Sequence, residues 1–344
     1  MAAAPHVVIL TSSGLRHVLP VSELAKRLAV HHGFTVTIVT YASLSTPGHS
    51  SPLASLPPGV SVAALPEVSI DDLPANAHLV TRILTVISCA LPALRDLLRS
   101  LLDSPAGITA FVTDMLCPAA LAIGKEMGLP GYVFYTSSLM SLLSFLYIPE
   151  LARTTTCECR DLPEPVVLRA ACLYTAPISS SPSRTAPTPS YAVGRFTRQR
   201  CPDSDEAKHS CLRWLDNQPD DSVLYVSFGS GGTLSMAQTA ELAAGLEASG
   251  QRFLWVVHHP NEKDSSAAYL GTAARRWVCL GLPWEEVAVL VREIMKGKKG
   301  AAARKKAGHL QDEAEIASAP GGPQDQALAI VADMVSLHRR SHSE

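Results

Sequence analysis

The stretch His6-Val-Val-Ile-Leu-Thr-Ser12, followed by a turn through Gly14, decides the fold class. Its apolar run predicts a buried β-strand that leads directly into an amphipathic helix. Pro20 lies near the start of that helix. Four apolar residues of the helix follow the i, i+3, i+4, i+7 spacing of a face packed on a sheet: Val21, Leu24, Ala25 and Leu28. This order predicts an α/β protein, in which ligands bind at the carboxyl ends of the strands.

Two residues at predicted strand ends could form a catalytic pair. His17 follows the first strand, and Asp114 ends a second predicted strand, residues 108–114, just before a helix predicted near Pro118. If both strands share one sheet, the carboxylate can fix the imidazole tautomer while the other ring nitrogen removes a proton. Two plainer interpretations stay open: a surface histidine near a helix start, and an aspartate that caps the following helix.

A second strand–turn–helix pattern lies further along the chain. A strand over 223–228 leads into Gly229-Ser-Gly-Gly-Thr233, and Ser235 and Gln238 form a capping-box pattern at the next helix. Glycine N–H groups and a helix N-terminus could bind a phosphate there, although turn geometry alone explains the glycines equally well. A P-loop is excluded because its lysine is absent. A dinucleotide fingerprint also fails, since Leu234 stands where its third glycine should be.

Composition narrows the class of protein further. The 344 residues, of which 47% are hydrophobic, suffice for two domains. A net charge of −2 with 17% charged residues argues against nucleic-acid binding. The sequence holds no Gly-x-Ser-x-Gly elbow of a serine hydrolase, and Cys157-Glu-Cys159 lacks further ligands at zinc spacing. No metal site is therefore expected.

Neither a signal peptide nor a membrane span is expected. The apolar stretch near the N-terminus is short and lacks a charged leader region. Residues 79–102 are apolar overall, but a proline and several charged residues interrupt them. We therefore expect a cytoplasmic protein without stable membrane insertion.

Several segments, taken together and in order, resemble plant UDP-dependent glycosyltransferases. Ser12-Ser-Gly-Leu-Arg-His17-Val-Leu-Pro20 resembles the opening of the family, and Thr113-Asp114 its catalytic aspartate segment. Cys211-Leu-Arg-Trp-Leu-Asp216 and Ser222-Val-Leu-Tyr-Val-Ser-Phe-Gly-Ser230 are similar to the start of its second domain, and Phe253-Leu-Trp-Val-Val257 also fits. Within the family, the resemblance is greatest to enzymes that glucosylate small phenols such as hydroquinone.

The resemblance implies a fold of two Rossmann-like domains, the GT-B type, with an incomplete second domain. Residues 1–170 would form the acceptor-side domain, and residues 171–200 a Ser/Pro-rich linker. Residues 201–322 would form a truncated donor-side domain, and residues 323–344 a C-terminal helix.

The resemblance also implies a reaction. His17 would deprotonate an acceptor hydroxyl, Asp114 would orient it, and the oxygen would displace UDP from the sugar, glucose, with inversion. The acceptor would be a small hydrophobic, phenolic molecule, the UDP-sugar a co-substrate, and no metal or other cofactor would take part. The donor would lie near Ser12, Gly14, Ser230 and Gly231. By position, Met115, Leu116 and Ser137 could line the acceptor pocket, or equally be plain core. Neither the residues nor the resemblance indicates an oligomeric state.

The chain also departs from the family. The donor-binding signature, a Trp-Ala-Pro-Gln stretch followed by His-Cys-Gly-Trp-Asn-Ser and an acid-Gln pair, is missing between Val257 and Pro283. The linker also lacks strands and helices that the family normally has in this region. Two internal segments of the family pattern are therefore absent. Arg16 replaces the usual glycine, where it could obstruct the site or pair with a phosphate. The alternative to an enzyme is an inactive homologue that binds a small hydrophobic ligand or a protein partner.

Overall fold

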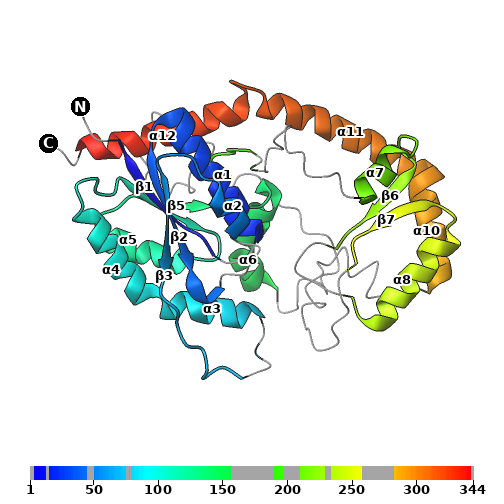
Figure 1. Cartoon of the computed structure of the whole chain (residues 1–344), viewed down its shortest axis with the longest axis horizontal. Helices are drawn as coiled ribbons and strands as arrows, with labels where there is room; N and C mark the ends of the chain where they lie inside the picture. Colours follow the sequence, from blue (N-terminus) through cyan, green and yellow to red (C-terminus); the bar gives the residue numbers. More distant parts are fainter. Residues whose placement is uncertain are drawn as a thin grey trace. The chain divides into compact units, whose positions relative to one another are not determined.

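The computed structural model forms two compact units, Met1–Gln199 with Ile316–Glu344 and Arg200–Glu315 (Figure 1). The residues that the structure describes are 4–12, 15–44, 50–74, 77, 79–155, 190–194, 196, 210–228, 234–257 and 283–341. The predicted linker, 171–200, lies almost entirely outside these residues.

The first unit contains a five-stranded sheet whose paired strands all run parallel, in the order β3-β2-β1-β4-β5. The strands are β1 (His6–Leu10), β2 (Thr35–Tyr41), β3 (Val60–Leu65), β4 (Ala110–Asp114) and β5 (Gly131–Phe134). Successive strands proceed outward in one direction from β1 and in the other from β4, so the strand order reverses between these two neighbours. In their register Leu10 lies opposite Thr113. The carboxyl ends of β1 and β4 therefore adjoin at the switch point where open α/β sheets bind ligands.

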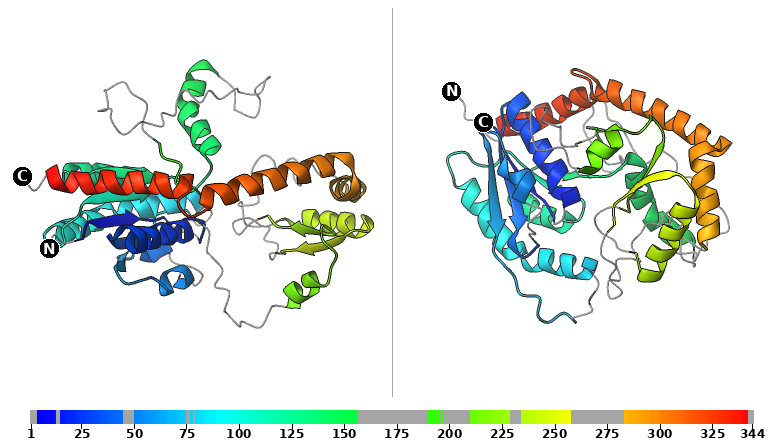
Figure 2. Two further views of the ribbon diagram at one scale, coloured as in Figure 1. Left: turned by 90° about the horizontal axis from the view of Figure 1, so that it is seen from above. Right: turned by 45° about the vertical axis from the view of Figure 1, so that its right-hand side comes forward.

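Helices cover both faces of this sheet. They are α1 (Leu15–His32), α2 (Ser50–Ala54), α3 (Leu79–Cys89), α4 (Leu91–Leu102), α5 (Leu121–Glu126) and α12 (Pro323–Ser341), with short 3₁₀ turns at Ala42–Leu44 and Pro118–Ala120. A further helix, α6 (Leu139–Thr154), follows β5 and projects away from the sheet (Figure 2). Side chains alternate along β1: Val7 and Ile9 pack with α1 and α12, whereas Val8 and Leu10 pack with α3, α4 and α5. This alternation gives the unit two separate cores, one on each face.

The predictions for the first strand and helix are confirmed in their essentials. All four apolar residues of the predicted packing face of α1 are buried. The strand ends at Leu10 rather than at Ser12, and Pro20 lies inside α1 because the helix already begins at Leu15. The second predicted strand, 108–114, begins two residues later than expected, at Ala110.

The second unit contains one parallel pair of strands, β6 (Val223–Val226) and β7 (Arg252–Trp255), joined through α8 (Met236–Ala248). Its other helices are α7 (Ser210–Asp216), α10 (Trp284–Lys296) and α11 (Lys298–Ser318), of which the last three residues belong to the first unit. The capping box predicted at α8 is present: Ser235 Oγ accepts a hydrogen bond from Gln238 N (3.2 Å), and Gln238 Oε1 accepts one from Ser235 N (3.0 Å). The glycine turn before it, residues 229–233, lies outside the described residues.

Packing between α8 and α10 supplies most of the described core of this unit. None of the eight residues of β6 and β7 is fully buried, and a two-stranded sheet is marginally stable by itself. Leu246 of α8 and Ala288 and Val291 of α10 are buried. The two helices lie side by side (Figure 2). Gly245 makes their close approach possible, because a Cβ built there would lie 2.5 Å from Val287 Cβ and 2.9 Å from the Trp284 carbonyl oxygen.

Gly245→Ala is therefore expected to destabilise the second unit by about 1–3 kcal/mol, the usual cost of overpacking. Tryptophan fluorescence during urea unfolding measures this directly, because all four tryptophans of the chain lie between residues 200 and 315. Gly308→Ala in α11 is the matched control. A Cβ there meets no atom within 4 Å, so this change is expected to be stabilising, by up to about 1 kcal/mol. Equal effects of the two substitutions would contradict the packing argument.

Candidate active site

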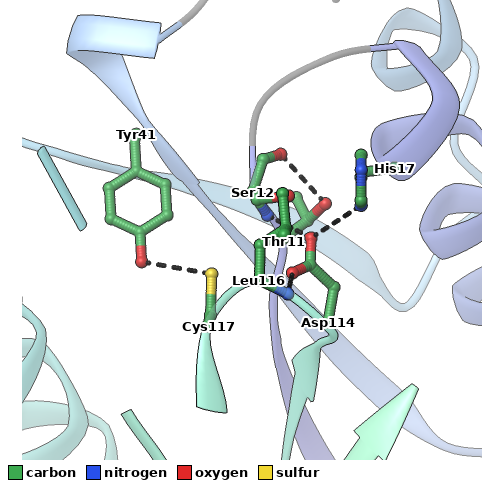
Figure 3. A network of polar contacts seen from close by, with 7 residues as sticks. All are labelled: Thr11, Ser12, His17, Tyr41, Asp114, Leu116 and Cys117. Atoms are coloured by element: carbon green, nitrogen blue, oxygen red, sulfur yellow. Dashed lines mark hydrogen bonds and ion pairs between the residues drawn. The ribbon is translucent and has the colours of Figure 1, made fainter. Parts of the chain in front are cut away.

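A buried carboxylate lies where β1 and β4 end. Asp114, the last residue of β4, is 0% exposed. Its Oδ2 accepts a hydrogen bond from Ser12 N at 2.5 Å, and its Oδ1 accepts one from Leu116 N at 2.8 Å (Figure 3). Ser12 follows β1 and Leu116 follows β4, so backbone donors from two chain segments fix the carboxyl group.

His17 lies against this carboxylate, as the paired-residue hypothesis requires. It is the third residue of α1, and its Nδ1 lies 3.3 Å from Asp114 Oδ2. This distance suits an ion pair, but the contact is not aligned as a hydrogen bond, and Nδ1 has no other hydrogen-bond partner in the described part of the chain. The Nδ1 side of the His17 ring contacts the buried carboxylate. The side chain is 19% exposed, so the ring also remains accessible to solvent.

The alternative role for Asp114, as a helix cap, does not match this geometry. The 3₁₀ turn Pro118–Ala120 has Cys117 at its N-cap position, and no side chain makes the capping bond. Both carboxylate oxygens are occupied by the contacts with Ser12, Leu116 and His17. The Asp114 carboxylate therefore bridges groups at the ends of β1 and β4 and does not cap the following helix.

Asp114 is held in its charged form. Burial alone raises the pKa of this carboxyl, but the contact with His17 and the hydrogen bonding from Ser12 outweigh burial, so the net pKa is below its ordinary value. An anion beside Nδ1 favours the tautomer with a proton on Nδ1, which leaves Nε2 as the proton acceptor. The pair has the electrostatics of an oriented general base.

The lowered pKa of Asp114 predicts how stability depends on pH. A carboxyl whose folded-state pKa is depressed stabilises the fold above its unfolded-state pKa of about 3.9, and this contribution is lost as the pH falls through the folded-state value. The free-energy difference between wild type and Asp114→Asn, from urea unfolding followed by circular dichroism, should be constant above about pH 5 and shrink below about pH 4.

Asp96→Asn serves as the control for this measurement. Asp96 lies on α4 with its side chain 79% exposed. Its substitution should leave the pH dependence of stability unchanged. If the difference in unfolding free energy between wild type and Asp114→Asn stayed constant down to pH 2, the proposed coupling between Asp114 and its neighbours would be contradicted.

Two buried groups behind Asp114 were not singled out from the sequence. Tyr41, the last residue of β2, donates a hydrogen bond from its hydroxyl to Cys117 Sγ at 3.6 Å, and Cys117 is a free thiol (Figure 3). Burial raises the pKa of both groups, and Asp114 raises that of Cys117 further, so both stay neutral. The one available sequence signal was that Tyr41 ends a run rich in β-branched residues, Thr35-Val-Thr-Ile-Val-Thr-Tyr41, which is typical of a strand.

Three buried polar atoms at this sheet edge have no hydrogen-bond partner among the described residues. They are Ser12 Oγ, Thr113 Oγ1 and His17 Nδ1. A buried polar atom without a partner is destabilising, and native proteins usually supply one. The same edge thus combines a base with hydroxyl groups able to bind a polar part of a ligand.

Comparison with known proteins places the chain in a family. No family model matches the chain. UDP-glycosyltransferase 72B3 from Arabidopsis thaliana is 35% identical over 311 residues, which cover 77% of this chain and 64% of that protein. Hydroquinone glucosyltransferase from Rauvolfia serpentina is 34% identical over 313 residues, 78% of this chain and 66% of that protein. The chain belongs to the plant UDP-glycosyltransferases. The matched region spans about two thirds or slightly less of these relatives.

A solved glycosyltransferase structure has the same fold. UGT2 from Phytolacca americana, complexed with UDP-2fluoro-glucose and pterostilbene, superposes with a TM-score of 0.78 at 26% sequence identity, covering 97% of this chain and 100% of that one. The predicted fold class, two Rossmann-like units of the GT-B type, is confirmed. The resemblance to the glycosyltransferase family is confirmed by the same comparisons.

The other predicted site residues are placed less completely. Gly14, Ser230 and Gly231 lie outside the described residues. Met115 and Leu116 are half-buried beside Asp114, and Leu116 packs on the core formed with α3, α4 and α5, so it is at least partly a core residue. Ser137 is exposed and follows β5, one strand away from Asp114.

Two expected absences concern only the described residues. No group of three or more histidine, cysteine or acidic side chains there is arranged to hold a metal ion. Among the helices that the structure describes, none combines the length and apolar composition needed to cross a bilayer.

Proposed function

We propose that this chain is a UDP-sugar-dependent glycosyltransferase that transfers glucose, with inversion, to the hydroxyl of a small phenolic acceptor. The observation that carries the proposal is His17 Nδ1 at 3.3 Å from the buried, anionic Asp114 at the switch point of the sheet. Two relatives support the substrate classes: one is a hydroquinone glucosyltransferase, and the other was solved with UDP-2fluoro-glucose and pterostilbene.

In the proposed reaction, His17 acts as the general base. The acceptor hydroxyl transfers its proton to Nε2 as its oxygen forms a bond to the anomeric carbon of the sugar. The bond from that carbon to the phosphate oxygen breaks, and UDP leaves with the electron pair. Asp114 stabilises the imidazolium that results, and attack opposite the leaving group inverts the configuration. The UDP-sugar is a co-substrate, so the proposal invokes no other cofactor.

The substrates are proposed to lie on either side of His17. The hydroxyl of Ser12, buried without a partner among the described residues, would face the donor, and Gly14, Ser230 and Gly231 would complete its phosphate side. Met115, Leu116 and Ser137 would line the acceptor side. In terms of domains, residues 1–170 would bind the acceptor and residues 201–322 the donor. Residues 171–200 would be the linker, and residues 323–344 the C-terminal helix.

The missing donor signature sets the expected rate. Each buried polar interaction that is absent weakens binding by about 1–3 kcal/mol, so losing several lowers donor affinity by orders of magnitude. We therefore propose that turnover is slow and that UDP-glucose does not saturate the chain at ordinary concentrations.

The direct test is incubation with UDP-glucose and hydroquinone, with the product identified by mass spectrometry and its anomeric configuration by NMR. The proposal predicts a β-glucoside, formed from the α-linked donor at a rate proportional to UDP-glucose up to about 1 mM. An α-glucoside would contradict the inverting mechanism. No product from a folded chain would contradict the enzymatic proposal itself.

The missing signature also favours a second candidate, a chain that binds an apolar ligand without turning it over. Apolar side chains of α6 are exposed after β5: Leu139, Phe145, Leu146 and Ile148. Binding of hydroquinone without product formation, measured by calorimetry on the same preparation, would distinguish this candidate from the enzyme.

A further inference from the structure

The helix α11 has almost no packing of its own. Every residue from 301 to 313 is exposed, and Gly300 is its one buried residue. In proteins, most of the stability of a helix comes from packing of an apolar face against other elements. A 21-residue helix in this state is a candidate for contact with another molecule.

The charges of α11 are segregated in the direction that does not stabilise a lone helix. Its first half carries the cations Lys298, Lys299, Arg304, Lys305 and Lys306. Its second half carries the anions Asp312, Glu313 and Glu315. Anions favour a helix N-terminus and cations a C-terminus, so the macrodipole of an isolated α11 opposes this arrangement. A second helix running in the opposite direction would offset this unfavourable arrangement, because each basic half would then lie beside an acidic half of the other helix.

One face of α11 is suited to such a contact. Ala303, Ala307 and Leu310 follow the four–three spacing of a helix–helix seam, and Leu310 is 52% exposed. The two alanines allow close approach of a neighbouring backbone. Lys306 and Glu313 lie one position before Ala307 and one before half-buried Ala314, which places both beside the seam.

We propose that a second copy of this chain is the occupant of this face, with its α11 antiparallel to the first about a two-fold axis. When Ala307 lies against Leu310 of the second copy, the heptad geometry brings Lys306 beside Glu313 of the second copy. The two-fold axis repeats both contacts, so the same pairing occurs twice. Glu313 also lies 3.4 Å from His309 of its own helix, and its side chain is 59% exposed, which leaves it accessible to a partner. This inference is independent of the proposed catalytic activity.

The contact is small, and the dimer is expected to be weak and sensitive to salt. Sedimentation equilibrium of the full chain, at about 5–500 µM and low ionic strength, should show a reversible monomer–dimer equilibrium. Lys306→Glu replaces two attractions by two repulsions and should raise the dissociation constant on the order of tenfold. The double variant Lys306→Glu with Glu313→Lys exchanges the charges within each pair and should restore association.

Lys305→Glu is the matched control, because it makes the same change in net charge on the neighbouring residue, away from the seam. It should leave association unchanged, and circular dichroism should show that all variants keep their helical content. A chain that stays monomeric throughout this range would overturn the proposal. So would a Lys306→Glu variant that dimerises like wild type, or a double variant that fails to recover.

Discussion

His17→Ala is expected to lower glycoside formation by about 10²–10⁴-fold, the usual contribution of a general base. The loss follows because Nε2 is the proton acceptor left beside the acceptor site when Asp114 occupies the Nδ1 side of the ring. Initial rates with hydroquinone and UDP-glucose measure the effect. Asp114 keeps its hydrogen bonds from Ser12 N and Leu116 N in this variant, so the fold should persist at reduced stability, which circular dichroism checks.

His31→Ala is the matched control for this prediction. His31 lies at the other end of α1 and is exposed, so its removal changes the same helix without touching the β1–β4 edge. It should leave the rate unchanged. Turnover by His17→Ala at the wild-type rate would remove the general-base role from His17.

Replacing residues 258–282 by the donor-binding segment of a plant relative should raise UDP affinity by orders of magnitude. The segment carries the aromatic and acidic residues that the family resemblance associates with uracil and ribose, and each buried polar contact regained is worth about 1–3 kcal/mol. Calorimetric titration of the grafted chain with UDP gives the affinity. The graft also provides a faster background in which the His17→Ala loss can be measured.

The matched control is the same graft with alanine at its ribose-binding acid. This variant should fold like the full graft but bind UDP at least about tenfold more weakly, because one charged hydrogen-bonding group is gone. A folded graft that binds UDP no better than the natural chain would contradict the assignment of the second unit to the donor.

Local patterns predicted the parts of the fold that depend on neighbours in sequence. The apolar face of α1 and the capping box of α8 follow from spacings of three and four residues, and both are present. The His17–Asp114 contact required more, because it depends on β4 pairing with β1 across about one hundred residues. The family resemblance implied that His17 and Asp114 act together, whereas the residue pattern alone left open whether their strands share one sheet.

The remaining contacts of the site and of the second unit depend on tertiary packing that no local sequence pattern encodes. Tyr41 ends β2, whereas Cys117 lies three residues after β4, and the two meet only because β2, β1 and β4 are neighbours in the sheet. The backbone N–H of Leu116 donates a hydrogen bond to the Asp114 carboxylate, while its side chain packs against the core. The residue type alone does not reveal either role. The close contact between Gly245 and Val287 likewise follows from the α8–α10 crossing, not from either helix alone.

Calorimetric titration of the unmodified, folded chain with UDP tests the central claim most directly. That claim is that the acceptor-activating half of a glycosyltransferase site is assembled at His17 and Asp114, whereas the donor-binding half has lost its principal contacts. The account predicts a dissociation constant no tighter than about 1 mM, an affinity of roughly 4 kcal/mol. Micromolar binding would contradict it, since a competent donor site would then exist without the signature segment.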